Sequence, residues 1–558
     1  MIKQWLGILI ISISFARVPD ATGKYGAVTS SNEYASRIGL EVLKNGGNAI
    51  DAAIATGFAL AVVHPAAGNI GGGGFMLIRF ADGTVTSIDF RETAPATATR
   101  DMFLDENGDV IPGKSWNTSW AAGVPGSVSG YGLVHEKYGS MSWKKLLKPS
   151  IQLAKKGFKL DYQSSKSFEG YRQFLGADPV SDATFLFKEQ ISVGDLFVQS
   201  DLGQTLNRIS KNGPDEFYNG KTADMILHCM DRTNGLITKD DLNNYHAIER
   251  EPIKFEYRGY SVYSMPPPSS GGIALAGILN QLENINLSEI SYHSAEHIHY
   301  MTEAERRVYA DRSTMLGDMD FVPVPIEELI SQDYANEKWS SIDSVLATPS
   351  TDIHPKEQVE YNESGETTHF SVVDKWGNAV SVTTTINGWF GNGITVDGAG
   401  FLLNNEMDDF SSKPGVPNAY GLVGSRANEI APGKRMLSSM TPSIVENAEG
   451  NLFLVTGSPG GSKIITTTMQ VISNVIDFEM NIEDAVEEPR YHHQWLPDVI
   501  FVEPNGYSVE TLEKMEGNGY HFALSGVMGE ANCIMVDPTS GLIHAAGDSR
   551  RGASALAY

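Results

Sequence analysis

The sequence has little of several features that would point to particular classes of protein. Only two of its 558 residues are cysteines, Cys229 and Cys533, so at most one disulfide can form and a cysteine-rich zinc or iron–sulfur site is excluded. Positive charge is scarce, because 42 Lys and Arg residues face 68 Asp and Glu residues and leave a formal net charge of −26. A surface of that sign repels nucleic-acid phosphates and anionic lipid head groups, so a nucleic-acid partner is not expected.

Long hydrophobic runs are also missing after the first residues. No later segment reaches the roughly 18 unbroken apolar residues of a membrane-spanning helix. The chain begins with a basic residue, Lys3, then an apolar run over 5–15, and has small residues at Ser14 and Ala16. This pattern indicates a cleaved export signal, with a buried N-terminal strand as the alternative. We therefore expect a signal peptide over 1–16 and a periplasmic or secreted mature protein without an integral membrane span.

What the chain does contain is the composition of a globular protein, with 41% hydrophobic and 20% charged residues. Apolar residues recur at helical spacing over 33–45, and Asn48 precedes a strongly apolar helix candidate over 49–63. A glycine-dense segment, 68–74, leads into a predicted buried strand at 75–80. A dinucleotide-binding loop requires the opposite order, strand before glycines, so a cofactor loop is not predicted here.

The chain divides near residue 366. The stretch 340–366 is polar, contains Pro349 and Pro355, lacks periodicity and is predicted to be an exposed linker. Behind it, 367–386 changes abruptly to the alternation of a β-strand pattern.

This second part opens with a predicted hairpin. Two β-prone runs flank a three-residue loop, 375–377, whose last residue is glycine, which is typical of a type I turn with a G1 bulge. If Asp374 pairs with Asn378, then Thr367 lies opposite Thr385 at the end of the hairpin. Cross-strand threonine pairs are common in ordinary sheets, so this spacing alone does not indicate an active site.

Six short blocks carry a more specific signal. In chain order they are FRETAP at 90–95, PPPSSGG at 266–272, TTHFSVVD at 367–374, LNNEMDDF at 403–410, LSSM at 437–440 and TGSPGG at 456–461. Together they resemble the γ-glutamyltranspeptidase family, and the similarity extends from about Tyr25 to the C-terminus.

That family belongs to the N-terminal nucleophile hydrolases, so the resemblance implies an α/β (α+β) fold: a four-layer αββα sandwich with two stacked antiparallel sheets. It also implies a precursor that cuts itself between Glu366 and Thr367. The products would be a large subunit, 17–366, and a small subunit, 367–558, that form one structural domain as a heterodimer. A free α-amino group has a pKa of about 8 and can serve as the base for the threonine hydroxyl. The amide nitrogen of the uncut chain cannot act as this base.

The resemblance also implies roles for individual residues. Thr367 would be the nucleophile, Thr385 would hold its hydroxyl, and the backbone N–H groups of Gly460 and Gly461 would form the oxyanion hole. The γ-glutamyl group would be bound by Arg91, Ser438 and Ser439 at its α-carboxylate and by Asn387, Glu406 and Asp409 at its α-ammonium. The implied activity is that of a glutathione hydrolase and γ-glutamyltransferase, which passes the acyl group to water or to an amino acid or peptide amine. No metal or organic cofactor is implied.

The segment 414–435, which contains Tyr420, resembles the lid that covers the pocket in many members of the family. Some related acylases lack this lid, so its presence favours γ-glutamyl substrates. Glu406 stands where some bacterial members carry Gln, which leaves the acceptor preference open. Two alternatives remain: an acylase for another amide, and an inactive homologue that only binds.

One motif favours a rival mechanism. His293, Glu296 and His297 fit the H-x-x-E-H spacing of inverted zinc peptidases, with His299 nearby. The run 300–311 resembles a helix of the transpeptidase family that carries no metal, so we expect no metal site.

Overall fold

The structure is a computed structural model that describes residues 21–353 and 367–558. The predicted signal peptide and Glu366, on the N-terminal side of the predicted cleavage point, lie outside the described residues. Thr367 is the first described residue of the second part.

Two seven-stranded sheets form the centre of the molecule, and neighbouring strands within each run antiparallel. Sheet A is, in order, β1 (Ala21–Gly23), β18 (Ile543–Gly547), β17 (Asn532–Val536), β13 (Leu452–Thr456), β12 (Ser443–Glu446), β9 (Tyr260–Ser264) and β8 (Ile253–Tyr257). Sheet B is β19 (Ser554–Ala557), β2 (Ala27–Ser30), β10 (Thr368–Val373), β11 (Ala379–Thr385), β3 (Gly73–Arg79), β4 (Val85–Asp89) and β7 (Ile248–Arg250). Both sheets contain strands from before residue 354 and after residue 366. A chain break between them would therefore leave two interleaved pieces.

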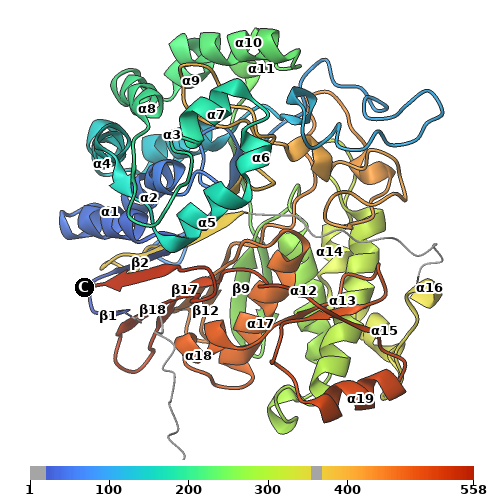
Figure 1. The fold of residues 1–558 in the computed structure, drawn as a ribbon. Coiled ribbons are helices and arrows are strands. Elements are labelled where there is room, and N and C mark those ends of the chain that lie inside the picture. Colours follow the sequence, from blue (N-terminus) through green and yellow to red (C-terminus); the bar gives the residue numbers. More distant parts are fainter. Residues whose placement is uncertain (1–20, 354–366) are drawn as a thin grey trace, which may run out of the picture.

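Helices cover the outer face of each sheet (Figure 1). On sheet B, α1 (Glu33–Lys44) and α2 (Ala49–Val63) pack against β2, β10 and β11. Further helices on this side are α3 (Ser127–Tyr138), α4 (Trp143–Lys156), α5 (Tyr162–Gly170), α6 (Arg172–Leu175), α7 (Pro179–Phe185), α8 (Ser200–Asn212), α9 (Asp215–Asn219), α10 (Lys221–Thr233) and α11 (Lys239–Asn244).

On sheet A, α12 (Gly271–Leu282) packs against β8, and α17 (Ile464–Ile476) packs against β13. Beside them lie α13 (Ala295–Met315), α14 (Ile326–Leu329), α15 (Gln332–Ser340), α16 (Ser350–Ile353), α18 (Ile482–Glu487) and α19 (Val509–Gly517), with the small sheet β14 (Tyr491–His492), β15 (Ile500–Val502) and β16 (Phe522–Leu524). The remaining pair is β5 (Phe158–Lys159) and β6 (Leu196–Phe197). The predicted four-layer αββα sandwich is confirmed.

Apolar side chains fill the space between the sheets, including Leu77 and Val373 from sheet B and Val455 and Ile534 from sheet A. A buried ion pair also joins them, because Arg79 Nε on β3 lies 2.6 Å from Glu446 Oε1 on β12.

Local sequence explains why these elements begin and end where they do. The Asn48 side chain accepts a hydrogen bond from the Asp51 backbone and forms a capping box with it, and α2 that follows is buried on every side. The hairpin register is the predicted one: Thr368 pairs with Thr384, and Gly377 in the turn has φ 90°.

The predicted exposed linker is wrong for part of its length. Residues 350–353 form α16, and the side chain of Ser350 is buried. Its hydroxyl donates to the Trp495 carbonyl at 2.6 Å and accepts from Arg306 at 2.7 Å, so tertiary contacts hold a segment whose own pattern is irregular.

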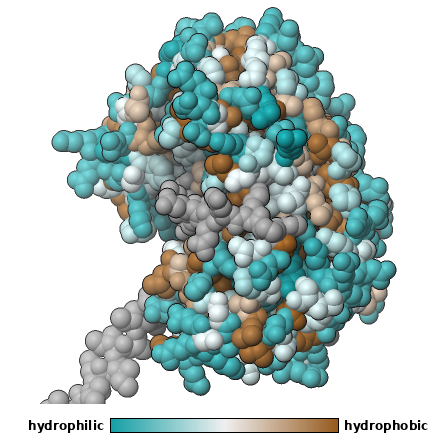
Figure 2. All heavy atoms as spheres, turned by 90° about the vertical axis from the view of Figure 1, so that its right-hand side faces the viewer, coloured by the Kyte–Doolittle hydropathy of each residue, from teal (hydrophilic) through white to brown (hydrophobic). Residues whose placement is uncertain are grey.

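Cys229 and Cys533 are free and buried, so they do not pair with each other. Within the described ranges, no helix is both long and apolar enough to cross a membrane. Figure 2 shows a mostly hydrophilic face with small separate hydrophobic patches, in keeping with the acidic composition.

Candidate active site

The sequence-predicted site residues come together from distant parts of the chain. Thr367, Thr385, Arg91, Asn387, Glu406, Asp409, Tyr420, Ser438, Ser439 and Gly461 all line one small cavity at the end of the β10–β11 hairpin. Gly460 is not among its lining residues. The cavity has a volume of about 20 Å³, so side chains must move before a ligand larger than water can enter.

The two threonines lie where the hairpin strands begin and end. Thr367 immediately precedes β10 and is 6% exposed, and Thr385 is the last residue of β11. The Asn387 backbone N–H donates to Thr385 Oγ1 at 2.8 Å, which fixes that hydroxyl. A Cβ on Gly72 would lie 2.0 Å from the Thr385 carbonyl oxygen, so the glycine-dense segment serves close packing against β11.

His369 is two residues beyond Thr367, the spacing at which side chains lie on the same face of a strand. Its ring is buried, with Nδ1 2.9 Å from Thr383 Oγ1 and Nε2 3.1 Å from Ser371 Oγ. Burial lowers the pKa of His369 to about 3, so the ring is neutral. With both ring nitrogens hydrogen-bonded, His369 is not placed as a base for Thr367.

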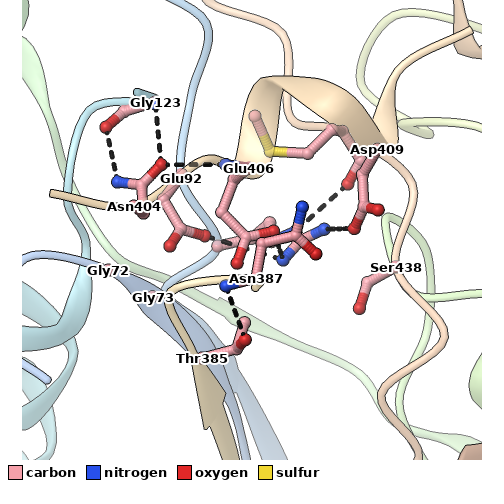
Figure 3. A network of polar contacts seen from close by, with 12 residues as sticks. Gly72, Gly73, Glu92, Gly123, Thr385, Asn387, Asn404, Glu406, Asp409 and Ser438 are labelled. Carbon is pink, nitrogen blue, oxygen red and sulfur yellow. Dashed lines mark hydrogen bonds and ion pairs between the residues drawn. The ribbon is translucent and has the colours of Figure 1, made fainter. Parts of the chain in front are cut away.

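A cluster of charges surrounds Arg91. Figure 3 shows its three carboxylates, Glu92, Glu406 and Asp409, near Asn387 and Thr385. Arg91 Nη1 lies 2.5 Å from Glu406 Oε2 and 3.7 Å from Glu92 Oε2, and Arg91 Nη2 pairs with Asp409. Arg91, Glu92 and Glu406 are almost fully buried. Asn404 accepts from the Gly123 and Glu406 backbones and so holds the loop that carries Glu406.

The contacts within this cluster go beyond what sequence reasoning predicts. It predicts Arg91 at the carboxylate end of a ligand and Glu406 and Asp409 at the ammonium end, and the structure adds that Arg91 is in direct contact with both carboxylates. The physical reason is burial, since each charge in a low-dielectric site requires a nearby counter-charge. Sequence reasoning also missed Glu92, although it directly follows Arg91, and Arg312, which lines the same cavity.

Tyr420 covers the cavity. Its hydroxyl donates to Asn387 Oδ1, and a Cβ on Gly461 would lie 2.5 Å from its ring. The neighbouring backbone is anchored by Asp408, which accepts from Ala419 N at 3.0 Å and from Ser115 Oγ at 2.6 Å. The segment predicted as a lid therefore contributes Tyr420 to the wall of the cavity that Thr367 and Gly461 also line.

Comparison with known proteins identifies the family. Residues 35–558 match the gamma-glutamyltranspeptidase family. The chain belongs to this family. It is 50% identical over 529 residues to the glutathione hydrolase proenzyme of Escherichia coli, covering 94% of this chain and 90% of that protein. It is 44% identical over 546 residues to the enzyme of the same name from Pseudomonas aeruginosa, covering 95% and 94%.

Solved structures agree with this membership. Cephalosporin acylase from Bacillus halodurans superposes with a TM-score of 0.85 at 26% identity, over 99% of both chains. The gamma-glutamyltranspeptidase of Helicobacter pylori is 45% identical, with a TM-score of 0.58 over 62% of this chain and 97% of that one. Enzymes of this family are N-terminal nucleophile hydrolases, so the predicted fold class and enzyme class are both confirmed.

The carboxyl groups around Arg91 in this transpeptidase-family site have raised pKa values. Burial raises the pKa of Glu92 to about 8 and raises that of Glu406 well above its ordinary value. Asp409 is shifted in the same direction for the same reason. Because Arg91 offers one positive charge to three carboxyl groups, we conclude that the cluster retains a proton near neutral pH.

Replacing Glu92 by glutamine is expected to change how stability depends on pH. The folded wild type keeps a proton on Glu92 between its ordinary pKa of 4.5 and about 8, whereas the unfolded chain has released it. Raising pH through this range therefore destabilises the wild type relative to Glu92→Gln, by at most about 1.4 kcal/mol per pH unit. Thermal unfolding midpoints of both proteins between about pH 5 and 8 test this. Parallel curves would contradict it, and Glu106→Gln, at an exposed position, is the control.

Two other motifs do not form sites. His297 is buried and His293 is half-buried, and both lie among aromatic rings. This burial lowers the pKa of His293 to about 4 and that of His297 to about 3. No group of three or more His, Cys, Asp or Glu side chains in the described parts of the chain could hold a metal.

The chain also contains one match to the P-loop pattern G-x-x-x-x-G-K-[ST], at 108–115. A phosphate-binding loop of that kind opens into a helix, whereas this segment continues through turns. Lys114 lies over the Trp120 ring, and Ser115 donates to Asp408, so both residues have other roles.

Proposed function

We propose that this protein is a self-cleaving γ-glutamyltransferase and glutathione hydrolase with Thr367 as its nucleophile. The observation that carries the proposal is the meeting, in one buried cavity, of a threonine at the start of β10 with a compact cluster of opposite charges. A threonine supplies the acyl acceptor, and the charges match the zwitterionic end of a γ-glutamyl group.

Cleavage between Glu366 and Thr367 turns the Thr367 amide nitrogen into a free amine. That amine then takes the hydroxyl proton while Thr367 Oγ attacks the γ-carbonyl carbon. The C–N bond of the γ-amide breaks, the departing amine receives the proton, and a γ-glutamyl ester remains on Thr367. Water then releases glutamate, or an amino acid or peptide amine forms a new γ-amide. The neutral, hydrogen-bonded state of His369 supports the amine as the base.

The other predicted residues support these steps by their positions. Gly461 borders the cavity, and Gly460 precedes it with φ 133°, a conformation that favours glycine. We propose that their N–H groups stabilise the oxyanion, where one donor is typically worth about 3 to 4 kcal/mol. Thr385 orients Thr367, and Tyr420 with Asn387 closes the site from the lid.

We propose that the charged groups of the zwitterion replace some of the contacts within the Arg91 cluster. The α-ammonium meets Asn387, Glu406 and Asp409, and the α-carboxylate meets Ser438, Ser439 and Arg91. The cluster already contains both signs of charge, so a zwitterion enters without adding net charge. The interleaved sheets support a heterodimer of 17–366 and 367–558 after cleavage, and the N-terminal pattern supports an exported enzyme.

Three chromogenic anilides test the proposal. L-γ-glutamyl-p-nitroanilide carries both ligand charges, 4-aminobutyryl-p-nitroanilide lacks the carboxylate, and glutaryl-p-nitroanilide lacks the ammonium. The purified protein is expected to release nitroaniline fastest from the γ-glutamyl compound, and glycylglycine should increase the rate by accepting the acyl group. Faster cleavage of the glutaryl compound would indicate an acylase instead, and no cleavage of any anilide would indicate a binding homologue.

A further inference from the structure

Arg312 differs from the other buried arginines of this protein. Those with a carboxylate within 4.0 Å are Arg79, Arg91, Arg306, Arg307, Arg435 and Arg490. Arg312 is 5% exposed, and within 21–353 and 367–558 no carboxylate reaches ion-pair distance of it. Asp409 attracts Arg312 only from beyond ion-pair distance. A buried cation without a counter-charge in contact with it is costly, so this position points to an anion that arrives from outside the fold.

Arg312 contacts the serine pair of the site. From α13, its Nη2 donates to Ser439 Oγ at 3.0 Å and its Nε donates to Ser270 Oγ at 2.9 Å. The Ser270 hydroxyl in turn donates to the Ser438 carbonyl at 2.6 Å, and the Ser270 backbone N–H donates to the same oxygen at 2.8 Å. Arg312 therefore holds one serine of the pair directly and the other through Ser270.

The direction of these hydrogen bonds is fixed by chemistry. A guanidinium group can only donate, so Ser439 Oγ must be the acceptor. The Ser439 hydroxyl proton is then free to point away from Arg312, and in the described part of the chain no acceptor takes it. Arg312 and Ser439 both line the Thr367 cavity, so a ligand there is the available acceptor.

Since the proposed function places the γ-glutamyl group in this cavity, we infer that Arg312 is a positioning residue for its α-carboxylate. It turns Ser439 into a hydrogen-bond donor and adds a second positive charge to that of Arg91, which is shared with Glu406 and Asp409. Burial lowers the pKa of Arg312, and the attraction of Asp409, which forms no ion pair with it, opposes this shift without reversing it.

The carboxylate that Arg312 serves could belong to the γ-glutamyl donor or to an acceptor or leaving group, and these two cases must be distinguished. Arg312 also lines a larger cavity of about 360 Å³ beneath the lid segment, together with Asp408 and Leu422. An acceptor or leaving group could present its own carboxylate there. We favour the donor's α-carboxylate because Ser439 lines only the Thr367 cavity of the two.

The test compares L-γ-glutamyl-p-nitroanilide with 4-aminobutyryl-p-nitroanilide, which lacks the α-carboxylate. For Arg312→Met, the ratio of the two kcat/KM values should fall about 10- to 100-fold, because a charge-assisted contact is lost for one substrate only. Arg312→Lys should recover part of that ratio, since it keeps the charge without the guanidinium geometry. The matched control is Arg307→Lys on the same helix, where Arg307 is paired with Glu303 and does not line the cavity.

Ser439→Ala provides a second, independent measurement. It should lower the same ratio, and the double variant Arg312→Met/Ser439→Ala should lose little more than either single change, because both act on one contact. If Arg312→Met fails to fold or to cleave itself, Ser270→Ala, Ser439→Ala and Arg312→Lys carry the test.

Equal losses on both anilides would overturn the inference and show a purely structural role. It would also be overturned if Arg312→Met changed only the preference between glycylglycine and glycylglycinamide, because the acceptor's carboxylate would then be the partner. Failure of the proposed function looks different, because the wild type itself would then cleave none of the three anilides or would cleave the glutaryl compound fastest.

Discussion

A Thr367→Ala protein is expected to remain a single uncut chain and to release no nitroaniline from γ-glutamyl-p-nitroanilide. The wild type should instead give a fragment of 192 residues, 367–558, beginning Thr-Thr-His-Phe. The physical reason is that, in the proposed mechanism, the hydroxyl attacks the preceding peptide carbonyl and later the substrate, and alanine has no oxygen with which to do either. Denaturing gels, N-terminal sequencing and the anilide assay measure both effects.

Thr367→Ser is the matched control for this change, because it keeps the hydroxyl and removes only a methyl group. It should cleave itself and keep measurable activity. A Thr367→Ala protein that still separated into two fragments, or a mature fragment with a different first residue, would contradict the proposed nucleophile.

Replacing Arg91 by leucine is expected to cause the largest loss of stability in the site. The variant removes the cation that forms ion pairs with Glu92, Glu406 and Asp409. Removal of one partner from a buried pair typically costs about 3 to 5 kcal/mol in the free energy of unfolding. The pKa values of all three carboxyl groups are already raised by burial, so further protonation should reduce the loss in acid and increase it as pH rises. We also expect kcat/KM for γ-glutamyl-p-nitroanilide to fall by at least about 100-fold.

Urea unfolding followed by tryptophan fluorescence measures the first effect, and the anilide assay measures the second. Arg79→Leu is the control, since Arg79 and Glu446 form a buried pair that joins the two sheets away from the cavity. It should destabilise the protein without changing the ratio between γ-glutamyl and 4-aminobutyryl substrates. If Arg91→Leu were as stable as the wild type, the charge cluster would not have the energetic role described above.

The features predicted correctly from the residues depend on partners that are only a few positions apart in the sequence. Capping of α2 by Asn48 depends on a neighbour three residues away, and the hairpin register depends on a three-residue loop ending in Gly377. Spacing fixes such contacts, because the chain between the partners is too short to allow many alternatives. The short motifs and their order were likewise enough to indicate the family.

Only the tertiary structure decided which charges meet. Arg91 and Glu406 are 315 positions apart, and Arg312 meets Ser439 across 127 positions. No periodicity connects residues at such separations. Whether a buried charge has a partner depends on which segments the two sheets and their helices bring to one cavity. Residue types therefore predicted which residues gather at the candidate site. The fold determined that Arg91 is paired with Glu406 and Asp409 and that Arg312 contacts the serine pair.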